Sequence, residues 1–132
     1  MKFLTKNTDY AARALIVLAG HRGEYISARD IAEEQDMPYQ FTRRILQELI
    51  KKDIVASKEG GRGGVILQRD PEDIKIIELI NIFQGEVELF DCMFRDKLCK
   101  NRATCVLRHK IQKITEIVKK EFADITIASL MG

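Results

Sequence analysis

Three cysteines carry the clearest capacity for chemistry in this chain. Cys92, Cys99 and Cys105 are separated by six and by five residues, and the sequence of 132 residues has no other cysteine. Thiolates bind zinc and iron-sulfur clusters, but zinc ligands commonly come in pairs about two to four residues apart, and three thiolates leave a tetrahedral metal one ligand short. The spacing alone leaves two alternatives open: a metal or cluster site, and three unrelated cysteines that serve as small apolar residues.

The charge around the cysteines favours the first alternative. Residues 92–110 contain six basic residues and a single acidic residue, Asp96. Nearby positive charge stabilises the thiolate, which is the form of cysteine that binds metal. The odd number of cysteines also argues against a disulfide framework. A metal or redox role is therefore the question that this segment raises, and three unrelated cysteines stay open as the alternative.

A second basic region, residues 38–69, indicates nucleic-acid binding. It holds seven Lys and Arg against three acidic residues, whereas the formal net charge of the whole chain is only +2. Arginine and lysine contact guanine edges and phosphates, and glutamine pairs with adenine. A solvated helix face is the alternative explanation for such residues. We predict base contacts from Gln40, Arg43 and Arg44, and backbone contacts from Lys51, Lys52, Lys58 and Arg62.

The periodicity of the sequence places these side chains on a helix-turn-helix. Ser27 and Asp30 resemble a capping box that begins a short helix ending near residue 35, and Pro38 suits the first turn of a third helix that ends near residue 52. A short helix, a tight turn and a longer helix with basic and amide side chains outside are typical of DNA-binding proteins. The apolar face of the longer helix is predicted to consist of Phe41, Ile45, Leu46, Leu49 and Ile50.

A glycine-rich hairpin is predicted next. Residues 54–57 and 65–67 are short β-prone runs, and the segment between them contains four glycines. A hairpin that follows a helix-turn-helix makes a winged helix. Because glycine allows the backbone to approach a DNA groove closely, Gly63 and Gly64 join Arg62 among the predicted DNA contacts.

The first twenty residues predict a helix of the domain rather than a targeting segment. Apolar residues recur at helical spacing over residues 8–20, with Asn7 or Thr8 as the cap. Asp9 and Arg13 interrupt the apolar stretch, and no small-residue cleavage site follows. No window approaches the ~18 uncharged apolar residues of a membrane span. We expect a cytoplasmic protein that does not contact a membrane.

Two further helices are predicted in the remainder of the chain. Asp70 and Pro71 begin the first, which ends near Gln84. The second begins near Val106, and its apolar stripe needs a partner, because the winged-helix core is already closed by its own helices. We infer that this helix packs against its copy in a second subunit. The stripe consists of Leu107, Ile111, Ile114, Ile117, Val118 and Phe122, and it leads into Ile125, Ile127 and Leu130.

The expected fold is mainly α with a small β-hairpin wing. Residues 1–84 are predicted to form a winged helix-turn-helix DNA-binding domain, residues 85–106 a cysteine-rich cluster-binding loop, and residues 107–132 a dimerisation helix and tail. The sequence has no phosphate-binding loop, nucleophile elbow or pair of catalytic carboxylates. We therefore expect a protein that is not an enzyme; a small ferredoxin-like electron carrier would leave the helix-turn-helix unexplained.

Several sequence features occur together along the whole chain. They are residues 4–11, Ile31-Ala32-Glu33, Gly60 with Gly63-Gly64, Leu79-Ile80, the three cysteines and residues 124–130. In this combination the chain resembles the Rrf-two family of winged-helix repressors, which includes the IscR-like and NsrR-like iron-sulfur regulators. The resemblance implies a homodimer in which three cysteines of each subunit hold an iron-sulfur cluster that controls binding to a palindromic operator DNA.

The resemblance also implies candidates for the fourth cluster ligand. Asp9 stands where NsrR-like members carry an Asp that binds a 4Fe-4S cluster of the opposite subunit, so Asp9 is the first candidate. His109 lies four residues after Cys105, one residue further along than the histidine that IscR-like members use for a 2Fe-2S cluster. A 4Fe-4S cluster is therefore favoured, with a 2Fe-2S cluster as the alternative.

Two departures from the family pattern and two alternative functions accompany this interpretation. The spacing after Cys92 is one residue longer than the commonest arrangement, and Glu59 stands where relatives often carry Arg beside the wing glycine. The predicted function is a repressor whose cluster senses nitric oxide, redox or iron-sulfur status. The alternatives are a cluster-free regulator that acts through cysteine oxidation or a protein partner, and a zinc-stabilised regulator that uses the three cysteines with His109.

Overall fold

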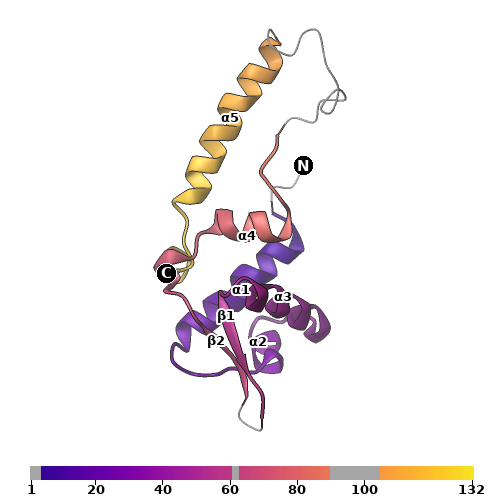
Figure 1. Ribbon diagram of the computed structural model, residues 1–132, viewed down its shortest axis with the longest axis vertical. Coiled ribbons are helices and arrows are strands. Elements are labelled where there is room, and N and C mark those ends of the chain that lie inside the picture. Colours follow the sequence, from indigo (N-terminus) through magenta and orange to yellow (C-terminus); the bar gives the residue numbers. More distant parts are fainter. Residues whose placement is uncertain (1–3, 61–62, 90–104) are drawn as a thin grey trace.

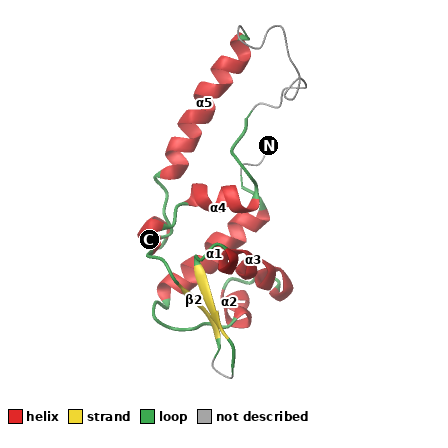
Figure 2. Ribbon diagram, viewed as in Figure 1, coloured by secondary structure: helices red, strands yellow, loops and turns green. Residues whose placement is uncertain are grey.

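Helices make up most of the structure, and one antiparallel hairpin projects from them (Figure 1). The computed structural model describes residues 4–60, 63–89 and 105–132. Figure 2 shows the hairpin at one end of the molecule and the last long helix at the other. The mainly α fold with a hairpin wing is confirmed. The elements are α1 (Lys6–Gly20), α2 (Ala28–Glu34), α3 (Tyr39–Lys51), β1 (Val55–Lys58), β2 (Gly64–Leu67), α4 (Ile76–Phe83) and α5 (Val106–Ala123).

The first helix begins two residues earlier than predicted. Its N-cap is Thr5, whose hydroxyl oxygen accepts the backbone N–H of Thr8, so the prediction of Asn7 or Thr8 as the cap is wrong. The Thr8 side chain is engaged elsewhere: its hydroxyl donates to Gln84 Oε1 at 2.6 Å. The same Gln84 oxygen accepts the N–H of Thr5 at 3.0 Å. A residue far along the chain therefore decides which threonine caps α1.

The helix-turn-helix has the predicted order and nearly the predicted boundaries. Ser27 Oγ accepts the N–H of Asp30 at 3.1 Å and caps α2. Pro38 is the N-cap of α3 rather than a residue of its first turn, and Thr42 Oγ1 donates to the Pro38 carbonyl at 2.9 Å. Thr42 is completely buried on the face predicted to be apolar. Its hydroxyl is satisfied within the helix, so the burial leaves no unpaired polar group.

The core of the winged helix lies where α1 meets α3 and α4. The side chains that fill it are buried and come from segments along the whole chain, and the largest of them have less than 2% of their surface exposed. Burying a large aliphatic side chain stabilises a fold by roughly 1.5–3 kcal/mol. The largest members are Leu15, Leu18, Ile31, Leu49, Ile54, Ile74, Leu79, Ile80 and Ile127.

The wing is a two-stranded antiparallel hairpin that also pairs with the segment before α2. Its register runs from Val55 opposite Leu67 to Lys58 opposite Gly64. Val65 exchanges two backbone hydrogen bonds with Ile26, of 2.8 and 2.9 Å. Gly64 lies so close to this pair that a Cβ atom there would stand 2.5 Å from the Ile26 carbonyl oxygen, and its φ is +153°. The fold itself therefore requires glycine at this position.

The helix predicted from Pro71 to Gln84 is interrupted, so the prediction of a continuous helix is wrong for residues 71–75. A 3₁₀ turn spans Pro71–Asp73, and Ile74 is extended before α4 begins. Ile74 accepts the N–H of Ile127 at 2.9 Å, and Ile76 donates its own N–H to Ile125 at 2.9 Å. Both Ile74 and Ile127 are completely buried. Hydrogen bonds with the carboxyl-terminal tail keep this backbone extended instead of helical. The local pattern of apolar residues cannot predict a partner that lies so far along the chain.

No residue of α5 is buried by the described part of its own chain. Figure 1 shows this helix projecting from the body of the molecule at the end opposite to the wing. Val106, Leu107, Ile114 and Ile117 are between 48% and 66% exposed. Ile127, by contrast, packs in the core of its own chain. The amino-terminal part of the apolar stripe is therefore the most exposed in the described chain, whereas Phe122 at its end packs against the core and Ile127 of the tail that follows is buried in it.

We predict that Gly64→Ala destabilises the protein by about 1–3 kcal/mol, since the added methyl group meets the backbone of Ile26 in a strained conformation. Urea unfolding followed by circular dichroism measures this change. Gly20→Ala is the matched control, because a Cβ atom at Gly20 meets nothing within 4 Å. Equal stability of the two variants would contradict the prediction.

Candidate DNA-binding face and cluster-binding residues

The exposed face of α3 carries the side chains predicted to read bases. Gln40, Arg43 and Arg44 are all exposed, and Gln47 lies one turn further along the same face. The opposite face holds the buried residues of the helix. The helical period brings residues three and four apart to one side, so a continuous polar and basic surface results. A surface of this kind on the second helix of a helix-turn-helix suits the major groove.

The ring of Tyr39 lies close to two arginines that come from different helices. The guanidinium carbon of Arg29, on α2, lies 4.6 Å from the centre of the Tyr39 ring, and that of Arg43 lies 5.8 Å from it. Both distances are within the range of cation–π attraction. Sequence reasoning missed Arg29 and Tyr39, because the contact joins two helices whose relative placement no local pattern reveals. The cluster extends the basic surface from α3 to the start of α2.

The end of the wing next to its tip supplies a further cation. Lys58 is exposed, and its ammonium group lies 5.6 Å above the Tyr25 ring. Arg62 lies outside the described residues. Gly63 and Gly64 have a reason to be glycine that is independent of DNA, because a Cβ atom at either would collide with backbone oxygens of Lys58 or Ile26. Their predicted contact with DNA stays a prediction.

Two basic residues of the 38–69 region are engaged within the protein. Lys51 pairs with Glu48 at 3.1 Å on the surface of α3. Arg69 donates to Glu78 at 2.6 Å and to the Asp73 carbonyl at 2.7 Å, and the Glu78 hydrogen bond raises the pKa of Arg69. The positive charge that faces outward is therefore smaller than a count along the sequence indicates.

One of the three cysteines lies within the described residues. Cys105 is the half-buried N-cap of α5, and its Sγ accepts the N–H of Arg108 at 3.5 Å. The amino-terminal end of a helix favours negative charge, which suits a thiolate ligand. His109 is exposed one turn later, and its backbone N–H donates to the backbone carbonyl of Cys105 at 3.1 Å. Cys92 and Cys99 lie outside the described residues.

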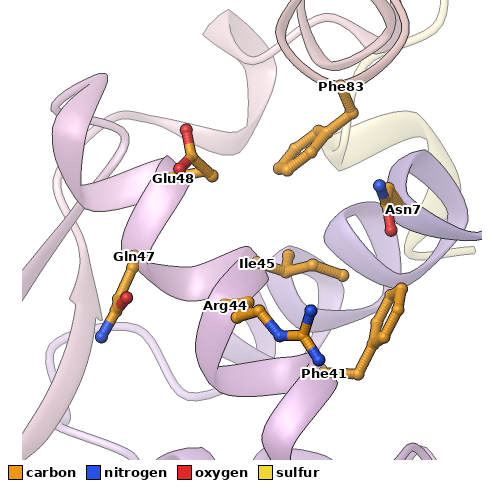
Figure 3. A pocket seen from close by; sticks show the side chains of 7 residues that line it. All are labelled: Asn7, Phe41, Arg44, Ile45, Gln47, Glu48 and Phe83. Atoms are coloured by element: carbon orange, nitrogen blue, oxygen red, sulfur yellow. The ribbon is translucent and has the colours of Figure 1, made fainter.

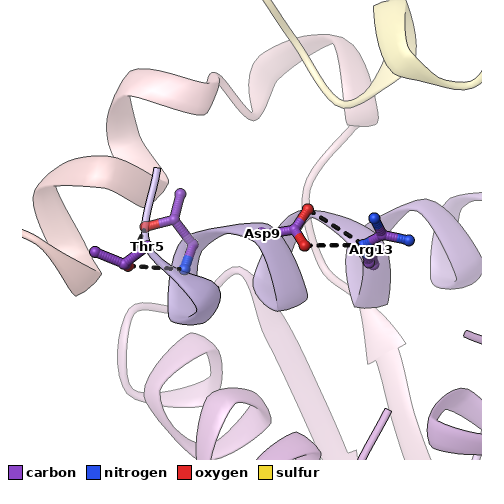
Figure 4. Close-up of polar contacts among 4 residues, drawn as sticks. Thr5, Asp9 and Arg13 are labelled. Carbon is purple, nitrogen blue, oxygen red and sulfur yellow. Dashed lines mark hydrogen bonds and ion pairs between the residues drawn. The ribbon is translucent and has the colours of Figure 1, made fainter. Parts of the chain in front are cut away.

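Asp9 presents its carboxylate to an arginine of its own helix. Arg13 Nε lies 3.2 and 3.1 Å from the two carboxylate oxygens, and both side chains are about half exposed (Figure 4). Asp9 directly follows Thr8, which is hydrogen-bonded to Gln84 at the end of α4. Within the described ranges, no three His, Cys, Asp or Glu side chains converge as metal ligands would. The full ligand set remains a prediction.

Comparisons with known proteins agree with this arrangement. Residues 4–132 match the Rrf2 family model, described as an iron-dependent transcriptional regulator. This chain belongs to the Rrf2 family. The resemblance of the sequence to the Rrf-two family, which is the same family, is therefore confirmed.

Three Rrf2-related proteins define the likeness more closely. The transcriptional regulator NsrR of Bacillus subtilis is 32% identical over 112 residues, which are 83% of this chain and 77% of that protein. The repressor NsrR of Streptomyces coelicolor is 29% identical over 131 residues, 98% of this chain and 88% of its own. The structure of T. potens IscR has a TM-score of 0.77 at 26% identity and covers 99% of this chain and 86% of that one.

This Rrf2 chain is thus a DNA-binding transcriptional regulator. Its relatives are regulators, which confirms that it is not an enzyme. None of the helices in the described residues is both long and apolar enough to cross a membrane.

We predict that Arg43→Ala weakens binding to operator DNA roughly 5- to 100-fold, as expected for loss of a base-reading arginine. Fluorescence anisotropy at fixed salt measures the affinity. Tyr39→Leu removes the ring beneath both arginines and should weaken binding by about two- to fivefold.

The matched control for these variants is Lys120→Ala, which removes one positive charge from the exposed surface of α5. DNA affinity of this variant should stay within about twofold of the unchanged protein, because charge far from the interface is screened by salt. An equal loss in Arg43→Ala and Lys120→Ala would mean that the α3 face is wrongly assigned.

Proposed function

We propose that this Rrf2 protein is a dimeric repressor whose affinity for operator DNA is switched by an iron-sulfur cluster. Cys92, Cys99 and Cys105 would hold the cluster in each subunit. The observation that carries the proposal is the position of Cys105, a half-buried thiol at the positive end of α5, in a chain of a family whose model is described as iron-dependent. The NsrR and IscR names of its relatives support the same cofactor.

The described donor atoms fit such a group. Thiolates are the usual ligands of iron-sulfur clusters, and the Cys105 Sγ accepts one backbone N–H, as sulfur ligands of clusters commonly do. When bound, the cluster supplies a centre that reacts with nitric oxide or oxygen and changes its charge or composition. A 4Fe-4S cluster is the favoured form and a 2Fe-2S cluster the alternative.

The fourth ligand proposed is Asp9 of the partner subunit. In the described chain the Asp9 carboxylate is bound by Arg13, with both oxygens near Nε. A carboxylate that binds iron through one oxygen can still accept a hydrogen bond from Arg13 through the other, so ligation requires Arg13 to release one oxygen at most. An exposed ion pair of this kind contributes only about 0–1 kcal/mol. Releasing Asp9 from Arg13 therefore costs little free energy.

The route from the cluster to DNA runs through the start of α1. Gln84, at the end of α4, binds Thr5 and Thr8, and the predicted cysteine segment begins at the next residue. Helix α1 packs against α3, which carries the DNA-binding face. A shift of α4 therefore reaches α3 through packed helices. Only a cluster state that binds two such arrangements with different affinity can move the balance between them.

The dimer would form along α5. Leu107, Ile114 and Ile117 of its apolar stripe are exposed in the described chain, and a second copy of the helix offers the same stripe. A twofold dimer places two recognition helices in successive major grooves, roughly 34 Å apart. Dimerisation on α5 leaves the α3 faces of both subunits open to DNA.

A zinc-stabilised regulator is the second candidate function. Cys105 and His109 stand one helical turn apart on α5, a separation that suits two ligands of one metal. A cluster-free regulator that senses through cysteine oxidation needs only a pair of the thiols. Metal content distinguishes all three possibilities.

We predict that the anaerobically purified protein contains iron and sulfide and that Cys105→Ser loses both. Serine retains the N-cap of α5, since its hydroxyl accepts the same backbone N–H, so loss of iron reports on ligation rather than on folding. Cys92→Ser and Cys99→Ser should behave alike. Iron and sulfide analysis with absorption spectroscopy provides the measurement.

The variants that separate the alternatives are Asp9→Ala, Arg13→Gln and His109→Ala. A cluster bound by Asp9 predicts reduced iron in Asp9→Ala and full iron in the other two. A zinc site predicts reduced zinc in His109→Ala. A colourless protein that resists reconstitution with iron and sulfide would refute the cluster.

We predict that Ile114→Glu dissociates the dimer into subunits of 15.2 kDa. A carboxylate buried in an apolar interface without a partner raises the dissociation constant roughly a hundredfold or more. Analytical ultracentrifugation measures the mass. Gln112→Glu adds the same charge to α5 away from the stripe and should leave the dimer intact; dissociation of both variants, or of neither, would count against this interface.

A further inference from the structure

A cavity of about 280 Å³ lies beside the recognition helix, between α3, the start of α1 and the end of α4. Figure 3 shows its lining side chains, which come from all three helices. The lining combines apolar and polar groups: Phe41, Ile45 and Phe83 with Asn7, Arg44, Gln47 and Glu48. Ligand sites are typically apolar hollows with a few convergent polar groups and volumes of roughly 300–1,000 Å³. The lining of this cavity has that composition, and its volume of about 280 Å³ lies just below that range.

Arg44 determines the charge of a ligand that the cavity accepts. Its guanidinium carbon lies 5.8 Å from the centre of the Phe41 ring, and no carboxylate in the described parts of the chain forms an ion pair with it. The acidic side chain in the lining, Glu48, is paired with Lys51 at 3.1 Å. The cavity therefore offers an arginine without a counter-charge beside aromatic walls.

The geometry points to a binding site for a small organic acid with an aromatic or branched apolar body. We propose that the carboxylate of the acid is held by Arg44 and that its body fills the space between Phe41 and Phe83. Arginine binds carboxylates through two parallel hydrogen bonds, and the amide of Asn7 adds a polar partner beside the cavity. The volume excludes nucleotides and other large cofactors.

Occupation of this cavity would oppose DNA binding. Arg44 lies on the exposed face of α3 as well as at the cavity, so the same guanidinium serves either the acid or the DNA base that it is predicted to contact. This consequence rests on the proposed function, whereas binding of the acid does not. The acid acts without the cysteines, so it would give the regulator a second input.

Binding is tested with benzoate as the probe on the full chain in the absence of DNA. Isothermal titration at constant ionic strength should give saturable binding of one benzoate per chain. Benzamide, the neutral analogue, should bind at least about tenfold more weakly, because it lacks the charge that Arg44 recognises. Amide chemical shifts should move at Asn7 and Phe83.

Two variants locate the site. Arg44→Gln should weaken benzoate binding by about tenfold or more, and because Arg44 is exposed the variant should fold normally, as circular dichroism checks. Arg43→Gln removes the same charge from the neighbouring position, which contacts Tyr39 instead of the cavity, and should bind benzoate within about twofold of the unchanged protein. Equal binding of benzoate and benzamide, no saturation, or equal loss in both variants would overturn the site.

The effect on DNA is a separate arm of the experiment. Saturating benzoate should weaken binding to a duplex selected from random sequences by the protein itself, and it should not change the residual affinity of Arg44→Gln. An unchanged DNA affinity with benzoate bound would overturn the antagonism. Failure to bind any duplex would instead overturn the proposed function, and titration without DNA still decides the ligand site.

Discussion

The hydrogen bonds of Gln84 to the start of α1 are the interaction on which the arrangement of the functional residues depends. One amide oxygen accepts both the Thr5 N–H and the Thr8 hydroxyl, and Thr8 is 1% exposed. A buried hydroxyl without a partner costs about 1–3 kcal/mol, so this contact holds the first turn of α1 against the end of α4. Asp9, the proposed fourth ligand, directly follows Thr8 in the sequence. Asn7 directly precedes Thr8 and Phe83 directly precedes Gln84, and both of these residues line the cavity.

Two proposed inputs meet at this junction and reach DNA by different routes. The cluster would act through α4 and Asp9 on the position of α1, and α1 packs on α3. The organic acid would act on Arg44 itself, which belongs to the DNA-binding face. Each input works only through a difference in affinity between arrangements of the same residues. Because α1 contacts both α3 and α4, the two inputs are expected to influence each other.

The candidate DNA-binding face was predictable in part. The exposure of Gln40, Arg43 and Arg44 follows from the period of 3.6 residues, which places them opposite the buried face of α3. The number of available cations was not, because Lys51 and Arg69 are paired with Glu48 and Glu78. Nor was the Tyr39 cluster, whose two arginines belong to different helices.

The sequence by itself determined the order of the elements, because caps, glycine turns and apolar periodicity act over a few residues. The sequence also identified the three cysteines as candidate ligands and was sufficient to show the family to which the chain belongs. Tertiary structure alone decided that Thr5 caps α1, that Ile74 leaves the helix to pair with Ile127, and that a cavity opens beside Arg44. In each case the group that decides the local structure lies far along the chain and becomes a hydrogen-bonding or packing partner only when the chain folds. Leu107, Ile114 and Ile117 of the α5 stripe stay exposed in the described part of the chain, and a second subunit is the proposed source of a partner for them.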